Sequence, residues 1–577
     1  MLCSMACGGA AARGDAGAST TEGDSTIAGD AGTAATTTGD DGSSGVGGSD
    51  STRGDDGGVP PMDVGVAPPA AVWHVEQPAD SARTWLVSPA GERVFWLGVN
   101  TVMRDKTCDG ILDWIRRTDP STAANVEWAR LSTGSSGGES NAKPYCFNSV
   151  GGFSDTNDFD DDGGDSWMIR ATEDGGAGAP FGQVLVVDAR GDDRSLADEH
   201  GNVLQGGFAE ARIGDPYNPA FAADIAAMVA DDVAPRVGDP RLQMWFLGNE
   251  IGLFDRAGHG TVGVRDLRRW IWSPCPEGSD LDTPACAPHG LLAMLREHYG
   301  DPGALAAAWE LPVDDWTDVL AIHPVPYEHD CNQTCREDLQ RFVHDELLRR
   351  WIAVVTGTIR ATDPDHLLTT PRLAVGDAGT YRFWAPASEP GAEVWADAPQ
   401  TPVPTDAAVT YCPYDLFARD GELGFDLIAI NVYDGSAEFA EPWLSDGLIK
   451  LHERSGLPIV ISEFSVRARI QGWTNKGGAG VFVPVNDGVD DQIQRGAYYR
   501  SQLRQFAQHP FVLGASWHAW SDRYAAADPA HQIDMGLVQC DDPARGFEAG
   551  KRWAELDERV AEANCGIEAT LAELTGL

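Results

Sequence analysis

The segment Trp245-Phe-Leu-Gly-Asn-Glu250 gives the first indication of the fold. It is a short apolar run that leads directly into an amide and a carboxylate. A second stretch, Val460-Ile-Ser-Glu463-Phe, has the same form. Burying a carboxylate at a strand end costs several kcal/mol unless the group is paired or takes part in chemistry. Both stretches therefore predict buried strands that end in a functional site.

From Ala71 onward, apolar runs of strand length alternate with helical patterns, which predicts βα units and a parallel sheet. The runs show little polar alternation, as expected of strands covered on both faces. Most of them run into a polar residue. This arrangement is typical of an α/β protein of the (β/α)8 TIM barrel class, whose strand C-termini form the active-site floor. The eight predicted strands are Val94–Asn100, Tyr145–Val150, Val184–Asp188, Gln243–Leu247, His366–Thr370, Leu427–Tyr433, Ile459–Ser462 and Val512–Trp517.

Helical spacing predicts one helix that starts at Asn218-Pro219 and another from Asp338 to Arg360. The connection after strand four, residues 251–338, is long enough to be an insertion that shapes a substrate cleft. Within it, Leu291–Trp309 has a helix-like pattern. Before strand one, residues 73–92 are predicted to form a hairpin that closes the bottom of the barrel.

The chain ends are predicted to lie outside the barrel. Residues 8–70 consist of Gly, Ala, Thr, Ser and Asp with almost no large apolar side chain, which predicts a disordered tether. Residues 1–7 resemble the end of a lipoprotein signal with Cys7 as the lipid-modified residue, although the preceding apolar region is missing. The alternative is that residues 1–7 are an ordinary cytosolic N-terminus with no targeting function. The catalytic domain is predicted to span 71–565, and a closing helix begins near Glu548 before a tail at 566–577.

The composition of the chain disfavours several classes of binding partner. The net charge of −46 disfavours nucleic acid, anionic membranes and, more weakly, densely sulfated polymers as partners. No apolar stretch is long enough for a transmembrane helix. The 19 Trp residues suit a carbohydrate ligand, because indole rings stack on sugars. A polysaccharide substrate is therefore the expected partner, and the protein is expected to be exported, either as a cell-surface lipoprotein or in secreted form.

Cysteine spacing supports export. Cys275 with Cys286, and Cys331 with Cys335, could each close a surface loop, and neither pair has His or Cys neighbours at zinc spacing. Connectivity stays open at this point. The run from Asp158 to Gly163 copies the opening of a calcium loop, but Ile169 stands where the bidentate Glu should be, so a solvated acidic loop is favoured. We predict no metal and no cofactor.

The two glutamates suit glycoside hydrolysis. Retaining enzymes need two carboxyl groups about 5–5.5 Å apart, one protonated to assist the leaving oxygen and one ionised to attack the anomeric carbon. Strands four and seven lie across a barrel from each other, so Glu250 and Glu463 can meet over its mouth. The alternative is that each Glu only caps a loop. A serine hydrolase is unsupported, because Ser462 lacks the Gly-x-Ser-x-Gly context.

Asn-Glu at the end of strand four and Glu at the end of strand seven resemble the clan of retaining (β/α)8 glycosidases that includes β-galactosidases, β-mannanases and β-agarases. Several further segments, spread over residues 73–560, are similar to its agarase and β-galactosidase-like branch. The resemblance implies that Glu250 is the acid/base and Glu463 the nucleophile. The segments are Trp85-Leu-Val-Ser-Pro-Ala-Gly, Phe95-Trp-Leu-Gly-Val-Asn100, Phe147-Asn-Ser-Val-Gly-Gly-Phe-Ser-Asp155, His298-Tyr-Gly-Asp, Gly477-Gly-Ala-Gly-Val-Phe-Val and Gln494-Arg-Gly-Ala-Tyr-Tyr499.

The same resemblance assigns substrate-binding roles to other residues. Asn249 would bond the sugar 2-hydroxyl, Tyr433 would bond the nucleophile, and Trp517 would stack on the sugar in the −1 subsite, with Trp520 structural. His518 is predicted to bind a hydroxyl, and Asn431 and Asn100 to contact sugar. Arg372 could lower the pKa of Glu463 by its charge, with an ordinary rim ion pair as the alternative. The chain departs from the family pattern at Cys146 and Gly152, which stand where Gly and Asn are usual, and at an acidic insertion beginning at Asp155.

The sequence therefore predicts a retaining β-glycosidase, endo- or exo-acting, on a galactose-containing polysaccharide, agarase-like first. A β-galactosidase or another β-glycanase of the same clan is the nearest alternative. A surface lipoprotein that binds polysaccharide without cleaving it is the alternative from another class.

Overall fold

The computed structural model divides the chain into two units, Met1–Val66 and Ala67–Leu577. All described residues belong to the second unit. Predictions for Cys7, the tether, the calcium-like loop and Glu250 lie outside them. The described residues are 72–79, 81–102, 108–110, 145–154, 179–206, 211–249, 267–324, 331–375, 416–417, 423–433, 442–468, 492–525 and 528–575.

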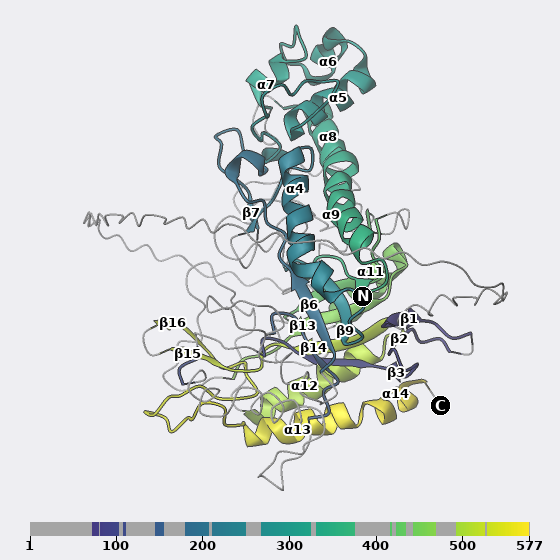
Figure 1. The fold of residues 1–577 in the computed structure, drawn as a ribbon, viewed down its shortest axis with the longest axis vertical. Coiled ribbons are helices and arrows are strands. Elements are labelled where there is room, and N and C mark those ends of the chain that lie inside the picture. The colour runs from purple at the N-terminus through teal and green to yellow at the C-terminus, as the bar shows by residue number, and fades with distance from the viewer. Residues whose placement is uncertain are drawn as a thin grey trace, which may run out of the picture. The chain divides into compact units, whose positions relative to one another are not determined.

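A closed parallel barrel forms the centre of the second unit (Figure 1), so the predicted fold class is confirmed. Its ladder runs in the order β10-β9-β6-β5-β4-β14-β13-β12-β11, and β14 pairs directly with β4. The strands are β4 (Trp96–Val99), β5 (Ser149–Val150), β6 (Phe181–Leu185), β9 (Leu242–Leu247), β10 (Leu367–Leu368), β11 (Leu373–Val375), β12 (Ile428–Val432), β13 (Ile459–Phe464) and β14 (Val512–Trp517).

The fifth strand of the barrel is interrupted between β10 and β11. Pro371 lies in the gap and has no N–H to donate to a ladder. β10 pairs with β9, whereas β11 pairs with β12. Isolated bridges join Thr369 to Leu427 and Asn249 to Arg372, so this strand is bonded on both sides and the barrel closes.

The barrel interior is apolar toward its N-terminal end and is plugged there. A three-stranded sheet of β1 (His74–Glu76), β2 (Trp85–Val87) and β3 (Arg93–Val94) precedes the barrel. Its Leu86, together with Trp73, packs in one cluster with inward-facing barrel side chains, so the predicted plug at the barrel bottom is confirmed. The barrel members of that cluster are Trp96, Val184, Met244, Phe246, Leu367, Leu427, Ala429, Val460 and Leu513.

Helices cover the outside of the barrel. Asn218 caps α4 (Pro219–Met228) by accepting from the backbone N of Ala220, as its place in the sequence predicts. The predicted helix over 338–360 is a long helical rod made of α8 (Gln333–Arg341), a π-helical turn η5 (Phe342–Leu348) and α9 (Arg349–Thr362). The remaining helices of this layer are α11 (Pro442–Ser455), α12 (Gln492–Ala507), α13 (Ala554–Cys565) and α14 (Ile567–Thr575).

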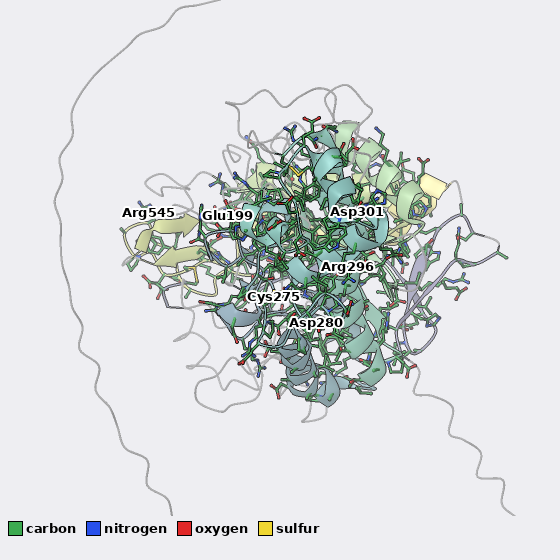
Figure 2. All side chains as sticks on the ribbon, turned by 90° about the horizontal axis from the view of Figure 1, so that it is seen from above. Glu199, Cys275, Asp280, Arg296, Asp301 and Arg545 are labelled. Atoms are coloured by element: carbon green, nitrogen blue, oxygen red, sulfur yellow. A yellow bond between two sulfur atoms is a disulfide. The ribbon has the colours of Figure 1, made fainter. Side chains whose placement is uncertain are left out.

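The insertion after strand four is helical in its second half. The sequence suggests one helical stretch over Leu291–Trp309, but the structure has two helices, α5 (Ala287–Tyr299) and α6 (Pro302–Trp309). Gly300 ends α5 in the left-handed conformation, and the Asp301 side chain caps α6. α7 (Asp318–Ile322) follows, and α6 packs against α8. Figure 2 shows Cys275, Asp280, Arg296 and Asp301 of this insertion, where Arg296 pairs with Asp282 at 3.0 Å.

Four disulfides join described cysteines. The two disulfides predicted to close surface loops, Cys275–Cys286 and Cys331–Cys335, are present. Two others, Cys108–Cys540 and Cys146–Cys565, join residues 432 and 419 positions apart, which spacing alone does not reveal. Cys146–Cys565 ties the start of strand two to the end of α13, which lies beside α12 (Figure 1). Within the part of the chain that the structure describes, no helix is long and apolar enough to cross a membrane.

Candidate active site

A β-bulge in β13 sets the direction of Glu463. Ile461 pairs with Ile430, and the next pair on these strands is Glu463 with Asn431, so Ser462 is the extra residue. Bulges at barrel rims redirect side chains. Here Ser462 bonds to Asn431 and Glu463 reaches the strand ends, whereas Phe464 faces outward against Tyr499 and Trp517.

Three side chains surround the Glu463 carboxylate, which is 3% exposed. Arg372 donates from Nη2 to Oε1, and the Tyr433 hydroxyl donates to Oε2. Nδ1 of His518 lies 3.9 Å from Oε1. Burial alone raises the pKa of Glu463, but the charges of Arg372 and His518 and the hydrogen bond from Tyr433 outweigh burial and lower the pKa below its usual value. The geometry therefore favours a carboxylate that is ionised at neutral pH.

Arg372 is fully buried beside Glu463. Its Nη2 also donates to the carbonyl oxygen of Ser462 at 3.1 Å. Its guanidinium carbon lies 5.2 Å from the centre of the Phe153 ring and 5.3 Å from the centre of the Phe246 ring. The arginine is thus held between two aromatic rings and β13.

A line of amide and hydroxyl hydrogen bonds connects strand seven to strand four. The Ser462 hydroxyl donates to Oδ1 of Asn431 at 2.7 Å, and Nδ2 of Asn431 donates to Oδ1 of Asn249 at 3.0 Å. These bonds fix which end of each amide faces which neighbour. Asn249 is partly exposed, and its Nδ2 has no partner among the residues that the structure describes, so this group can donate to a ligand.

Asn100 and Asn431 do not face a ligand in this structure, which corrects the prediction that both contact sugar. Both are 0% exposed. Nδ2 of Asn100 donates to the Ser462 carbonyl at 2.7 Å, and Ser516 donates to its Oδ1 at 2.8 Å. Asn100 therefore holds the backbone that precedes Glu463, and Asn431 orients Asn249.

Trp517 is a core residue, which corrects the prediction that it stacks on sugar. Its ring is 0% exposed, and its Nε1 donates to the carbonyl of Met535 at 3.1 Å. The ring packs edge-on against Phe464 and Tyr499, with Arg495 over it. Alternation along β14 explains the difference, because Ser516 points inward to Asn100 and its neighbour Trp517 points outward. His518 follows on the inner side, near Glu463. Trp520, predicted to be structural, is also buried.

Glu250, the second glutamate, directly follows Asn249 in the sequence but lies outside the described residues. For metals, the group of potential ligands found among the described residues is Cys275, Cys286 and His289. The Cys275–Cys286 disulfide occupies both thiols, so this group is not a metal site as it stands. Sequence reasoning missed Ser462, Ser516, Phe153 and Phe246 as neighbours of the site, although Gly152, which precedes Phe153, was visible as a departure from the family pattern.

Comparisons with known proteins bear on the fold. A scan against protein-family models and a search of curated proteins each found no match. Solved structures of similar fold include the agarase AgWH50C and an exo-β-agarase, each with a TM-score of 0.54 and 16% identity. Both alignments cover 87% of this chain but only 66% and 65% of those chains, just under two thirds of their length. BpGH50 has a TM-score of 0.52 and 13% identity, with 87% of this chain and 83% of that chain covered.

At these identities the likeness shows a shared fold. This chain has the (β/α)8 barrel that those proteins have.

Proposed function

We propose that this chain is a retaining β-glycosidase, with Glu463 as nucleophile and Glu250 as acid/base. The observation that carries the proposal is the environment of Glu463. A carboxylate buried at a barrel strand end, held by Arg372 and Tyr433 with its pKa lowered, is suited to attack an electrophilic carbon. A residue that only capped a loop would not need both donors.

The proposed reaction has two displacements. Glu463 attacks the anomeric carbon while Glu250 protonates the departing oxygen, which gives a covalent glycosyl-enzyme. Glu250 then removes a proton from water, the water attacks the same carbon, and Glu463 leaves. Tyr433 and Arg372 hold the nucleophile in place in both steps. Nδ2 of Asn249 donates to the sugar 2-hydroxyl, a contact that strengthens in the transition state.

The proposed substrate is a galactose-containing polysaccharide, in the manner of the agarases that share this fold. Two features support a neutral polymer from outside the cell. The net charge of −46 disfavours densely sulfated chains. Four disulfides suit an oxidising compartment, which supports export, with Cys7 as the proposed lipid attachment point.

Product analysis on a panel of polysaccharides tests this function. Agarose, porphyran, galactan, mannan and an aryl β-galactoside should be incubated with the wild type and with Glu463→Gln. We expect oligosaccharide release from agarose or galactan by the wild type alone. Release from mannan alone would point to a different β-glycanase, and release only from the aryl galactoside would indicate a β-galactosidase. Tight polymer binding without release of any product would favour the non-catalytic alternative.

A further inference from the structure

The surroundings of Arg372 direct its charge toward Glu463. Among the described residues, Nε and Nη1 of this fully buried side chain have no hydrogen-bond partner. The groups that cover the guanidinium are the neutral rings of Phe153 and Phe246. Aromatic faces attract a cation without carrying a charge. Among these contacts, Glu463 is the anion that pairs with Arg372.

Gly152 provides the space that this arrangement needs. A Cβ at position 152 would lie 2.6 Å from Nη1 of Arg372 and 2.9 Å from Cγ2 of Val184. Both distances are shorter than real Cβ atoms show, so any larger residue would push the guanidinium away. The Phe246 ring lies against the same guanidinium.

Phe153, whose ring packs against Arg372, has an unusual backbone conformation. Its φ is 56°, in the left-handed region that bulky residues rarely adopt. Such a conformation is strained and persists where the surroundings require it. Gly152 and Phe153, after strand two, therefore act together on Arg372. Gly152 leaves room for its guanidinium, and the Phe153 ring packs against the same group.

We infer that Gly152, Phe153 and Phe246 are positioning residues that hold Arg372 against Glu463 and so keep the attacking carboxylate ionised. This inference rests on the proposed function for its catalytic meaning. Its structural content, that the three residues set the ionisation of Glu463, can be measured without any substrate.

The main test is an infrared difference titration of Glu463, whose bands are identified by their absence in Glu463→Gln. In Gly152→Ala the displaced arginine should raise the apparent pKa of Glu463 by about one unit or more, because an opposite charge at contact distance lowers a carboxyl pKa by about 1–3 units. Phe153→Leu should give a smaller rise. Gly357→Ala is the matched control, since Gly357 is exposed on α9 with open space around its Cβ position, and it should change nothing.

The acidic limb of the kcat/KM profile gives a second readout. It should move to higher pH in Gly152→Ala by the same amount as the titration. A titration that does not move in Gly152→Ala overturns the inference even if thermal stability falls. If Gly152→Ala does not fold, Phe153→Leu alone decides by the same measurement, and an unmoved titration there overturns the inference.

A double-mutant cycle tests the contact itself. Lysine has no Nη1, so Gly152→Ala should reduce the melting temperature less in an Arg372→Lys background than in the wild type. Equal losses in both backgrounds would contradict the contact. The proposed function and this inference can fail separately. A wild type that is inactive on every glycoside, with a titration that moves as expected, refutes only the function, whereas an active enzyme with an unmoved titration refutes only the inference.

Discussion

Asn431 donates its side-chain amide to Oδ1 of Asn249 at 3.0 Å, across the mouth of the barrel from strand six to strand four. Because Ser462 donates to Oδ1 of Asn431, the direction of both amides is set by the strand that carries Glu463. The amide proposed to recognise the sugar 2-hydroxyl is therefore oriented by the neighbour of the proposed nucleophile.

Asn431→Leu tests this relationship. Leucine is branched at Cγ like asparagine but cannot donate, so Asn249 loses the bond that orients its amide. We expect kcat/KM to fall about 10-fold or more on a substrate with a 2-hydroxyl, which corresponds to a lost hydrogen bond of about 1.5 kcal/mol. The fall should be much smaller on the matching 2-deoxy glycoside. Equal losses on both substrates, measured side by side, would mean that Asn431 has only a general structural role.

The protonation of Asp215 should make the stability of the folded protein depend on pH. It is fully buried beside the start of the insertion, where it accepts hydrogen bonds from Ser273 and from the backbone N atoms of Ala287 and Tyr217. Burial raises its pKa from 3.8 to about 6, even though these donors oppose the rise. The folded state thus holds this proton more tightly than the unfolded state. Its contribution to stability is therefore fully present below about pH 4 and is lost as pH rises to about 6.

The corresponding measurement is the free energy of unfolding against pH for the wild type and Asp215→Asn. Relative to the variant, the wild type should lose about 3 kcal/mol between about pH 4 and pH 6, from a pKa difference of about two units. Parallel profiles through this window would show that Asp215 titrates normally in the folded protein.

A long-range disulfide should contribute more to the free energy of unfolding than a short one. With Cys108–Cys540 intact, removal of Cys146–Cys565 releases a loop of about 60 residues, for which chain entropy predicts a loss of about 4 kcal/mol. Cys331–Cys335 closes a loop of only four positions, and its loss should be about 2 kcal/mol. Guanidinium unfolding of the two double-alanine variants measures the order. A larger loss for Cys331→Ala/Cys335→Ala would contradict the entropic account.

Export with a lipid anchor is tested by phase partitioning. Produced with an apolar signal region ahead of the segment that holds Cys7, the wild type should enter the detergent phase, because a lipid on Cys7 adds buried hydrocarbon. Cys7→Ala should stay in the aqueous phase. Equal partitioning of the two proteins would remove the anchor from the account and leave secretion without lipid as the remaining route.

Much of the barrel could be predicted because most of its strands are short apolar runs that lead into a polar residue. The first and last residues of the strands were harder to predict. β6 begins at Phe181, three residues before the predicted Val184, since Gly182 and Gln183 do not look like a buried strand. The fifth strand was predicted to end at Thr370, but beyond Pro371 it continues as β11, which pairs with β12 whereas β10 pairs with β9.

The site was predictable where a residue type alone carries the chemistry, and not where local geometry decides. Tyr433 and Arg372 meet Glu463, as the sequence led us to expect. Trp517 was misplaced because residue type suggested stacking, whereas strand alternation puts it outside the barrel next to the inward Ser516. The bulge at Ser462 leaves no mark in the sequence, so the orientation of Asn431 and Asn100 could not be derived from it.

The most direct test of the central claim uses Glu463→Ala with an activated aryl β-galactoside and sodium azide. Alanine leaves room for the anion on the face where the nucleophile stood, and the aryl group departs without protonation. We expect azide to restore turnover and to give the α-glycosyl azide, formed by a single direct displacement. A β-glycosyl azide from this variant would contradict the account, because it would mean that another group forms the covalent intermediate and that Glu463 is not the nucleophile.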